Sequence, residues 1–211
     1  MLLGIAYFPP VSYFALMAKG FRLSADDVEP SVVYLEACEH YRKQSWRNRC
    51  RILTAGGPQD INFPVKHRDG TFNLPIRGIE VDYSTPWVLK TQRCIDAAYR
   101  SSAWFEYYRD PLFAILDAHP RTLWELDMGI LRFLMEKFGL KTEILPTEGY
   151  AAAHVDIHPK RPNAILRELG LERPYYQVFS DRFGFVPGLS AMDLLFNEGP
   201  GALGFILPDP A

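Results

Sequence analysis

The sequence has few cysteines, almost no net charge and no long uninterrupted apolar segment. Its three cysteines, Cys38, Cys50 and Cys94, are too few and too widely spaced for a disulfide framework or a zinc site with paired ligands. This pattern is typical of a reducing compartment, so we expect a cytoplasmic protein. The 23 Lys and Arg residues against 25 Asp and Glu give a net charge of -2, which excludes recruitment of nucleic acid by the charge of the whole chain.

The apolar N-terminus, residues 1–18, contains no basic residue, and Pro9 and Pro10 interrupt it. A secretory signal needs a basic region ahead of its apolar run, and a membrane span needs about 20 apolar residues. We therefore expect no signal peptide and no membrane span. With 48% hydrophobic and 23% charged residues, the composition is that of a soluble globular protein, which excludes intrinsic disorder.

Hydrophobic periodicity and turn residues predict a mixture of strands and helices. The predicted strands cover 2–8, 32–36, 46–54, 60–65, 77–82 and 141–145, with a turn at Gly56 and Gly57. The predicted helices cover 11–19, 86–100, 103–116 with an interruption at Pro111, 123–138 and 190–197. We therefore predict one α/β domain over residues 1–211, with a mixed sheet, a Rossmann-like start, a central helical segment and the first strand at the centre of the sheet.

A basic run between Tyr41 and Arg51 holds five cations and no acid. In a strand over 46–54, Arg47, Arg49 and Arg51 share one face at a spacing of about 7 Å. Guanidinium groups in such a row repel one another unless an anion or several carboxylates lie opposite them. Two interpretations stay open: a binding site for phosphate, pyrophosphate or carboxylate, and a solvated face balanced by acids of neighbouring strands. The candidate acids are Glu36, Glu39 and Glu80.

Three single residues could carry chemistry. Cys50 shares the apolar face of the same strand with Trp46, so a core residue is favoured over a nucleophile. His40 lies beside the basic run and could act as a general base, although a surface histidine is favoured. Asp127 lies on the apolar stripe of the helix that the Thr122 capping box opens. There it is either an acid in a cleft or a structural acceptor, and the second is favoured.

No metal site is expected. His154 and His158 flank Asp156, but in an extended segment they lie about 13 Å apart, too far for one ion. The sequence has no Gly-rich phosphate loop, no Gly-x-Ser-x-Gly motif and no kinase or zinc-protease signature. The residues by themselves thus predict an anion site and leave any cofactor unknown.

Several segments resemble the WbqC-like family of bacterial proteins, over nearly the whole chain. The most specific is Lys43-Gln-Ser-Trp-Arg-Asn-Arg49. The other matching segments are 6–14, 39–42, 63–65, 79–83, 87, 98–99, 105–108, 177–179, 184–185 and 189–200. The resemblance implies a role in bacterial surface polysaccharide (O-antigen type) biosynthesis, through modification of a nucleotide-linked sugar.

We expect the site where the first strand ends, because ligands gather at the carboxyl ends of strands in such sheets. Arg49 and Lys43 would bind phosphates, and Glu39 or His40 would serve as the catalytic base. The other residues expected to bind substrate are Tyr7, Tyr13, Tyr41, Gln44 and Asn48. The expected partner is a small molecule, a nucleotide sugar, and the sequence does not indicate an oligomeric state.

Two positions depart from the family pattern. Thr91 aligns with a family-typical His, and Cys38-Glu-His-Tyr41 replaces a His-Glu-Asn-Tyr stretch. Two hypotheses therefore stay open. The first is a transferase in which His40 substitutes for the missing histidine. The second is a non-catalytic ligand-binding or scaffolding protein of the same pathway.

Overall fold

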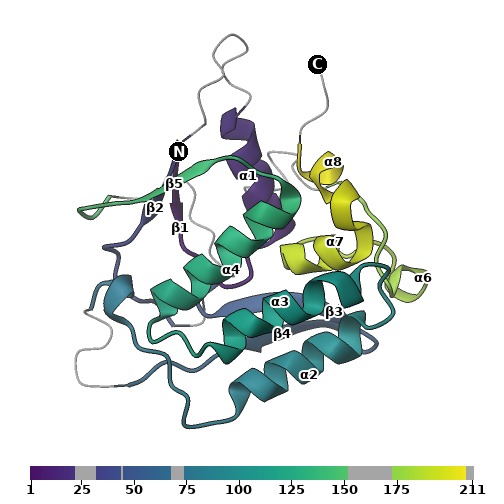
Figure 1. Ribbon diagram of the computed structural model, residues 1–211, viewed down its shortest axis with the longest axis horizontal. Helices are drawn as coiled ribbons and strands as arrows, with labels where there is room; N and C mark the ends of the chain where they lie inside the picture. The colour runs from purple at the N-terminus through teal and green to yellow at the C-terminus, as the bar shows by residue number, and fades with distance from the viewer. Residues whose placement is uncertain (22–31, 44, 68–73, 152–172, 208–211) are drawn as a thin grey trace.

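Within the part of the chain that the structure describes, three parallel strands form one sheet and an antiparallel hairpin forms a second (Figure 1). The computed structural model describes residues 1–21, 32–43, 45–67, 74–151 and 173–207. Strands β1 (Leu2–Gly4) and β5 (Glu143–Pro146) pair with opposite edges of β2 (Val32–Glu36). The predicted central place of the first strand was therefore wrong. β2 is central, because both its edges are paired, whereas β1 pairs on one side only among the described residues.

The first strand is also shorter than predicted, because the chain leaves the sheet after Gly4. The amide of Tyr7 donates to the carbonyl of Trp46 (2.7 Å) rather than to a strand partner, and Phe8 has a positive φ of 42°. Helix α1 (Val11–Phe21) then carries the chain to β2, and its residues 11–18 are all buried. The structure confirms a mixed α/β class and a parallel β1–α1–β2 crossover, but no Rossmann-like fold in further detail.

The predicted hairpin forms the second sheet, from β3 (Arg49–Thr54) and β4 (Gly57–Asn62). The antiparallel register places Arg51 opposite Asp60. Strand β3 of this hairpin starts at Arg49, three residues later than predicted. The predicted strand over 77–82 was wrong. That stretch is a 3-10 turn, η2 (Ile76–Gly78), followed by isolated bridges to two different segments, so no continuous ladder forms.

Helices α2 (Trp87–Tyr99), α3 (Phe105–Asp117) and α4 (Leu123–Phe138) form the predicted central helical segment. The Thr122 capping box is confirmed, since Thr122 Oγ1 accepts from the Glu125 amide (3.2 Å) and Glu125 Oε2 accepts from the Thr122 amide (3.0 Å). The predicted interruption of α3 was wrong. Pro111 points to solvent, and burial of Leu112 and Leu116 on the opposite side stabilises a continuous helix despite the lost hydrogen bond.

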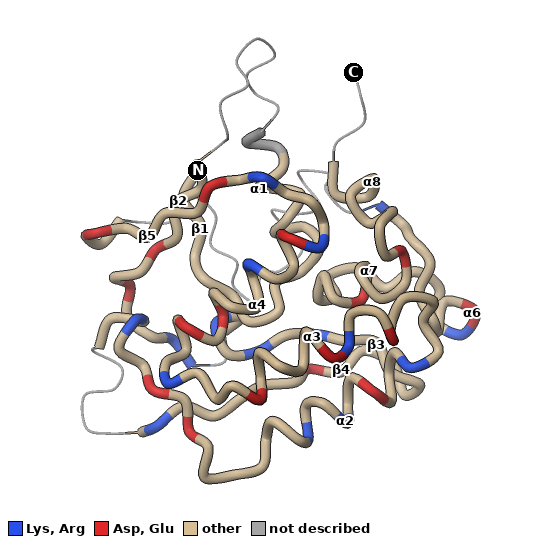
Figure 2. Tube along the Cα trace, viewed as in Figure 1, with Lys and Arg blue, Asp and Glu red and all other residues tan. Residues whose placement is uncertain are grey.

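The C-terminal part adds α6 (Ser180–Phe183), α7 (Ala191–Glu198), η3 (Gly199–Ala202) and α8 (Leu203–Ile206). Helix α7 contacts α1, α3 and α4, so the sheet side and the helical segment share one apolar core. Basic and acidic residues are both scattered over the described elements (Figure 2). Within the described residues, every helix is too short or too polar to span a bilayer.

Two carboxylic acids, Asp127 and Asp193, lie inside this core with 0% and 1% of their surface exposed. Burial raises the pKa of Asp193 from 3.8 to about 7, although hydrogen bonds from Tyr175, Tyr99 and Asn197 act in the opposite direction. Burial also raises the pKa of Asp127 well above 3.8, and the charge of Arg47 offsets this only in part. Both acids therefore favour the protonated form in the folded protein.

We predict that Asp193 makes the protein less stable as the pH rises from about 4 to about 7. In this window the unfolded chain has lost the proton and the folded chain still holds it, so the free energy of unfolding falls with pH and levels off above the folded pKa. A rise of about three units sets an upper bound of roughly 4 kcal/mol. Asp193→Asn should remove this part of the slope in urea unfolding across that pH range.

The exposed Asp181 on α6 provides the matched control, since Asp181→Asn should leave the slope as it is. Asp127, whose pKa burial also raises, should contribute to the slope that remains in Asp193→Asn. An unchanged slope in Asp193→Asn would contradict the prediction.

Candidate functional site

A hollow with a volume of about 580 Å³ lies between the β3–β4 hairpin and the start of α2. β3 contributes Arg49, β4 contributes Asp60 through Asn62, and the loop after β4 contributes residues 63–65 and His67. Helix α2 contributes Trp87, Lys90, Thr91 and Cys94. We call it the hairpin hollow. Its walls come from segments about 40 residues apart in sequence, so the hollow exists only because α2 packs on β3.

Cations outnumber acids in the hairpin hollow. Among its described lining residues, Lys43, Arg49 and Lys90 are basic and Asp60 alone is acidic. Asp60 also binds Arg51, whose Nε donates to Oδ1 at 2.8 Å, and its contact with Arg49 Nη1 is longer, at 3.4 Å. One carboxylate therefore serves two guanidinium groups. The hollow retains a positive charge that suits an anionic ligand.

Several polar atoms at the floor of the hairpin hollow are buried without a hydrogen-bond partner among the described residues. They are Arg49 Nε, Asn48 Oδ1 and Trp87 Nε1. The amide nitrogen of Asn48 is used, since Nδ2 donates to the carbonyl of Phe63 at 3.0 Å. Buried polar atoms normally find a partner in the protein or in bound molecules. These polar atoms therefore lie behind the surface of the hairpin hollow, without a partner among the described residues.

A smaller hollow of about 430 Å³ lies beyond the carboxyl end of β2. Its lining residues are Cys38, Glu39, His40, Arg42 and Tyr150, and we call it the sheet-edge hollow. Position after the strands of a parallel sheet is where ligands are expected in such folds. The sequence prediction of a site at the end of β1 falls close to this hollow, since Gly4 lies next to Glu39.

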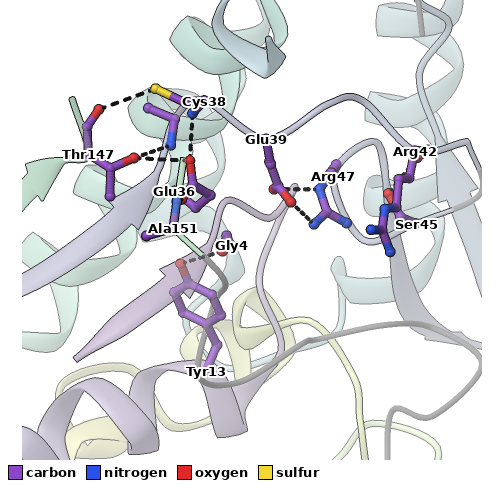
Figure 3. Close-up of polar contacts among 11 residues, drawn as sticks. Gly4, Tyr13, Glu36, Cys38, Glu39, Arg42, Ser45, Arg47, Thr147 and Ala151 are labelled. Atoms are coloured by element: carbon purple, nitrogen blue, oxygen red, sulfur yellow. Dashed lines mark hydrogen bonds and ion pairs between the residues drawn. The ribbon is translucent and has the colours of Figure 1, made fainter. Parts of the chain in front are cut away.

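The carboxylate of Glu36, only 1% exposed, organises this edge (Figure 3). Its Oε1 accepts from the Cys38 amide (2.7 Å) and from Thr147 Oγ1 (3.0 Å), and its Oε2 accepts from the Ala151 amide (2.7 Å). Cys38 follows β2, whereas Thr147 and Ala151 follow β5. Glu36 thus connects the segment that follows β2 with the segment that follows β5, which we call the two exit segments, and it fixes the walls of the sheet-edge hollow.

Next to Glu36, Glu39 forms an ion pair with Arg47 that is largely buried (Figure 3). Arg47 Nε donates to Glu39 Oε1 at 2.7 Å, and Arg47 Nη2 also contacts Oε2. The expectation that Arg47 shares a strand face with Arg49 was wrong. A turn holds residues 45–48, with the Asn48 amide donating to the carbonyl of Ser45, so Arg47 precedes the strand and turns to Glu39.

The two other acids that were expected to balance the basic face are engaged elsewhere. Glu36 accepts the hydrogen bonds described above, and Glu80 binds Lys66 and Arg121. Asp60 takes their place. Asp60 was missed because the predicted second strand began at residue 60, whereas a turn at residues 55 and 56 would have placed it opposite Arg51.

The structure divides the residues expected at the site into three groups. Tyr41, Lys43, Asn48 and Arg49 line the hairpin hollow. Glu39 and His40 line the sheet-edge hollow. Tyr7 and Tyr13 are fully buried, with Tyr7 packed on Phe63 of the floor (4.7 Å) and Tyr13 donating to the carbonyl of Gly4 (3.0 Å). Gln44 lies outside the described residues, as do His154, Asp156 and His158.

Burial governs the ionisation of the tyrosines at and below the site. It raises the pKa of Tyr41 to about 12 and raises the pKa values of Tyr7 and Tyr13 further. These phenols therefore remain protonated. Burial likewise raises the pKa of the Cys50 thiol, and Cys50 is 0% exposed, so the predicted core position is confirmed.

Sequence reasoning did not predict Trp87 or Tyr150 as lining residues. Trp87 begins α2 and stacks on Tyr83 at 5.6 Å, but an aromatic residue at a helix start gives no sign of a ligand. Tyr150 follows β5 with 70% of its surface exposed. An exposed tyrosine after a strand could have been recognised, had β5 been placed beside β2. No group of three or more metal-binding side chains occurs among the described residues.

Comparison with known proteins identifies one family. The model of the WbqC-like protein family matches residues 6–173. An uncharacterized protein of Mycobacterium tuberculosis, Rv1507c, is 27% identical over 227 aligned residues, which cover 93% of this chain and 92% of that protein. No solved structure gives a significant match. The matched range contains every lining residue named above for the two hollows.

We predict that Arg47→Met lowers the free energy of unfolding by about 3 kcal/mol, because it leaves the Glu39 carboxylate largely buried without its cation. Arg51→Ala is the matched control, since its ion pair with Asp60 is solvent-exposed and should change stability by less than about 1 kcal/mol. Urea unfolding measures both. Combining Arg47→Met with Glu39→Gln should recover part of the lost stability. Equal losses of stability in Arg47→Met and Arg51→Ala would contradict the prediction that breaking the buried ion pair costs more than breaking the exposed one.

Proposed function

Since the chain belongs to the WbqC-like family, we propose that it is a cytoplasmic transferase of bacterial surface polysaccharide (O-antigen type) biosynthesis that modifies a nucleotide-activated sugar. The observation that carries the proposal is the excess of cations in the hairpin hollow. A nucleotide sugar bears a diphosphate, and two guanidinium groups that share one carboxylate leave a site for such an anion. The proposed process rests on the family resemblance, and the proposed ligand rests on the charge of the hairpin hollow.

In this proposal Arg49 and Lys43 bind the diphosphate, with Lys90 adding a third cation. Lys90 forms no ion pair within the described part of the chain, so a ligand would not have to displace an acid from it. Asn48 and Tyr41 contact the ligand as lining residues, and Tyr41 donates to it through a hydroxyl that stays protonated. Tyr7 and Tyr13 are fully buried, so in this proposal they support the walls of the site and do not contact the ligand.

The catalytic base in this proposal is His40 rather than Glu39. Glu39 is committed to its ion pair with Arg47, whereas the exposed imidazole of His40 lies on the same segment with no side-chain partner among the described residues. A hydroxyl or amino group of the sugar would attack the donor and form the new bond. Its proton would pass to His40, and the leaving group would depart with the electron pair of the broken bond.

The alternative is a non-catalytic ligand-binding or scaffolding protein of the same pathway. It is favoured by Thr91, because the position that aligns with a family-typical His lies in the hairpin hollow and carries a hydroxyl that cannot act as a base at neutral pH. Thermal-shift titration separates the two. Stabilisation by a sugar nucleotide and by an acyl donor together supports the transferase, and stabilisation by partner proteins alone supports the scaffold.

We predict that Arg49→Ala abolishes the thermal shift produced by UDP-glucose, GDP-mannose or dTDP-glucose, whichever of these probes stabilises the native protein. Arg51→Ala is the matched control, because Arg51 shares Asp60 with Arg49 and carries the same charge but does not line the hollow. Both variants should unfold within about 1 kcal/mol of the native protein. Equal loss of binding in both would show that general surface charge, not the hollow, attracts the probes.

We predict the reverse for Cys50→Ala, which should lose roughly 1 kcal/mol of stability and keep ligand binding. Cys50 alternates with Arg49 along β3 and is 0% exposed, so its removal leaves a small cavity in the core. Urea unfolding and the same thermal-shift titration measure both properties. A stable Cys50→Ala protein that binds the probe normally but no longer turns it over would instead identify Cys50 as a nucleophile.

A further inference from the structure

One short segment, residues 38–43, lines both hollows. His40 and Arg42 belong to the lining of the sheet-edge hollow, and Tyr41 and Lys43 belong to that of the hairpin hollow. The two hollows therefore adjoin one another along this segment, and no other described segment contributes to both linings.

The sheet-edge hollow offers three side chains that no other group engages within the described residues. They are the imidazole of His40, the guanidinium of Arg42 and the ring of Tyr150. His40 and Arg42 are exposed, and Tyr150 has 70% of its surface open to solvent. A guanidinium binds phosphate through two parallel hydrogen bonds, and a tyrosine ring stacks on a planar base. This combination fits a molecule that carries both a flat ring and phosphate groups.

The walls of the sheet-edge hollow are fixed by buried contacts rather than by the exposed side chains. Glu36 holds Cys38 and Ala151 through backbone amides, one on each exit segment, and the Cys38 thiol contacts the carbonyl of Thr147 at 3.7 Å. Glu39 is fixed by Arg47. A preformed cavity at the carboxyl edge of a parallel sheet binds without the cost of ordering its walls.

We propose that the sheet-edge hollow binds a second substrate, a group donor built on an adenine nucleotide, while the hairpin hollow holds the sugar nucleotide. This inference rests on the proposed function, since it supplies the donor that a transferase needs. Tyr150 stacks on the ring and Arg42 binds the phosphates. ATP and coenzyme A thioesters share this chemistry, and they are the two sources that the experiment must distinguish.

The cysteines provide a separate reporter for each hollow. Cys38 lines the sheet-edge hollow, Cys94 lines the hairpin hollow, and Cys50 is buried in the core. The experiment measures the rate of alkylation of each cysteine by iodoacetamide, using mass spectrometry of the full-length protein after digestion. Cys50 should stay unmodified throughout and so confirms that the protein remains folded.

ATP or acetyl-CoA, added separately and again in the presence of UDP-glucose, should slow the alkylation of Cys38 and leave Cys94 unchanged. At a probe concentration about ten times its Kd, the rate should fall about ten-fold, in proportion to the free fraction of the protein. Protection by ATP alone or by acetyl-CoA alone identifies the source. Arg42→Ala should abolish this protection, whereas Arg93→Ala, an exposed cation on α2 that lines neither hollow, should keep it.

Three results would overturn the inference. The first is an unchanged Cys38 rate with both probes at millimolar concentration, and the second is protection of Cys94 in place of Cys38. The third is equal protection of Cys38 by inorganic phosphate, because the hollow would then recognise no ring. Failure of the proposed function would give a different result, in which sugar nucleotides do not protect Cys94 from alkylation. The Cys38 rate therefore tests the further inference, and the Cys94 rate tests the proposed function.

Discussion

The buried ion pair between Glu39 and Arg47 joins the segment that leaves β2 to the turn that enters β3. One partner follows the parallel sheet and the other precedes the hairpin, so the contact sets the position of the two strand systems relative to each other. A buried ion pair gains little energy over a well-packed apolar pair, but breaking it costs much. We therefore interpret this pair as a positioning contact. The segment it anchors, residues 38–43, is the one whose side chains line both hollows.

The hairpin register explains how a basic strand can be both an ion-pair network and an anion site. Asp60 lies directly opposite Arg51, and the two side chains meet at 2.8 Å. Arg49 reaches the same carboxylate only at 3.4 Å, from two residues further along the strand. Asp60 therefore neutralises Arg51 more completely than Arg49. The two interpretations of the basic run apply to different residues: Arg51 belongs to the network, and Arg49 is available at the hollow.

Elements whose signals are local could be predicted from the sequence. The Thr122 capping box and Gly139 fixed both ends of α4, and the Ser190 N-cap and Gly199 fixed those of α7. Strand β2 was also predicted correctly. Four of the nine residues expected at the site line the hairpin hollow, because they lie in or beside the basic run.

The failures all involve contacts between distant segments. The start of β3 depends on the hydrogen bond from the Tyr7 amide to the Trp46 carbonyl and on the ion pair of Arg47 with Glu39. Neither contact can be recognised from the hydrophobic pattern of residues 46–54. The same holds for the order of the parallel sheet, since nothing in the short strand at Leu2–Gly4 shows whether β5 will pair beside it or on the far edge of β2. A site built between such segments can be predicted by residue type but not by arrangement.

The buried Asp127 completes the electrostatic picture of the site. An ionised carboxylate beneath Tyr7, Tyr13 and Tyr41 would offset the cations of the hairpin hollow and weaken its attraction for an anion. Burial raises the pKa of Asp127 and so favours its neutral form. The three phenols, whose pKa values are also raised by burial, are neutral as well. Asp127 and the three phenols therefore add no negative charge beneath the cations of the hairpin hollow, and the buried ion pair of Glu39 with Arg47 is neutral as a pair.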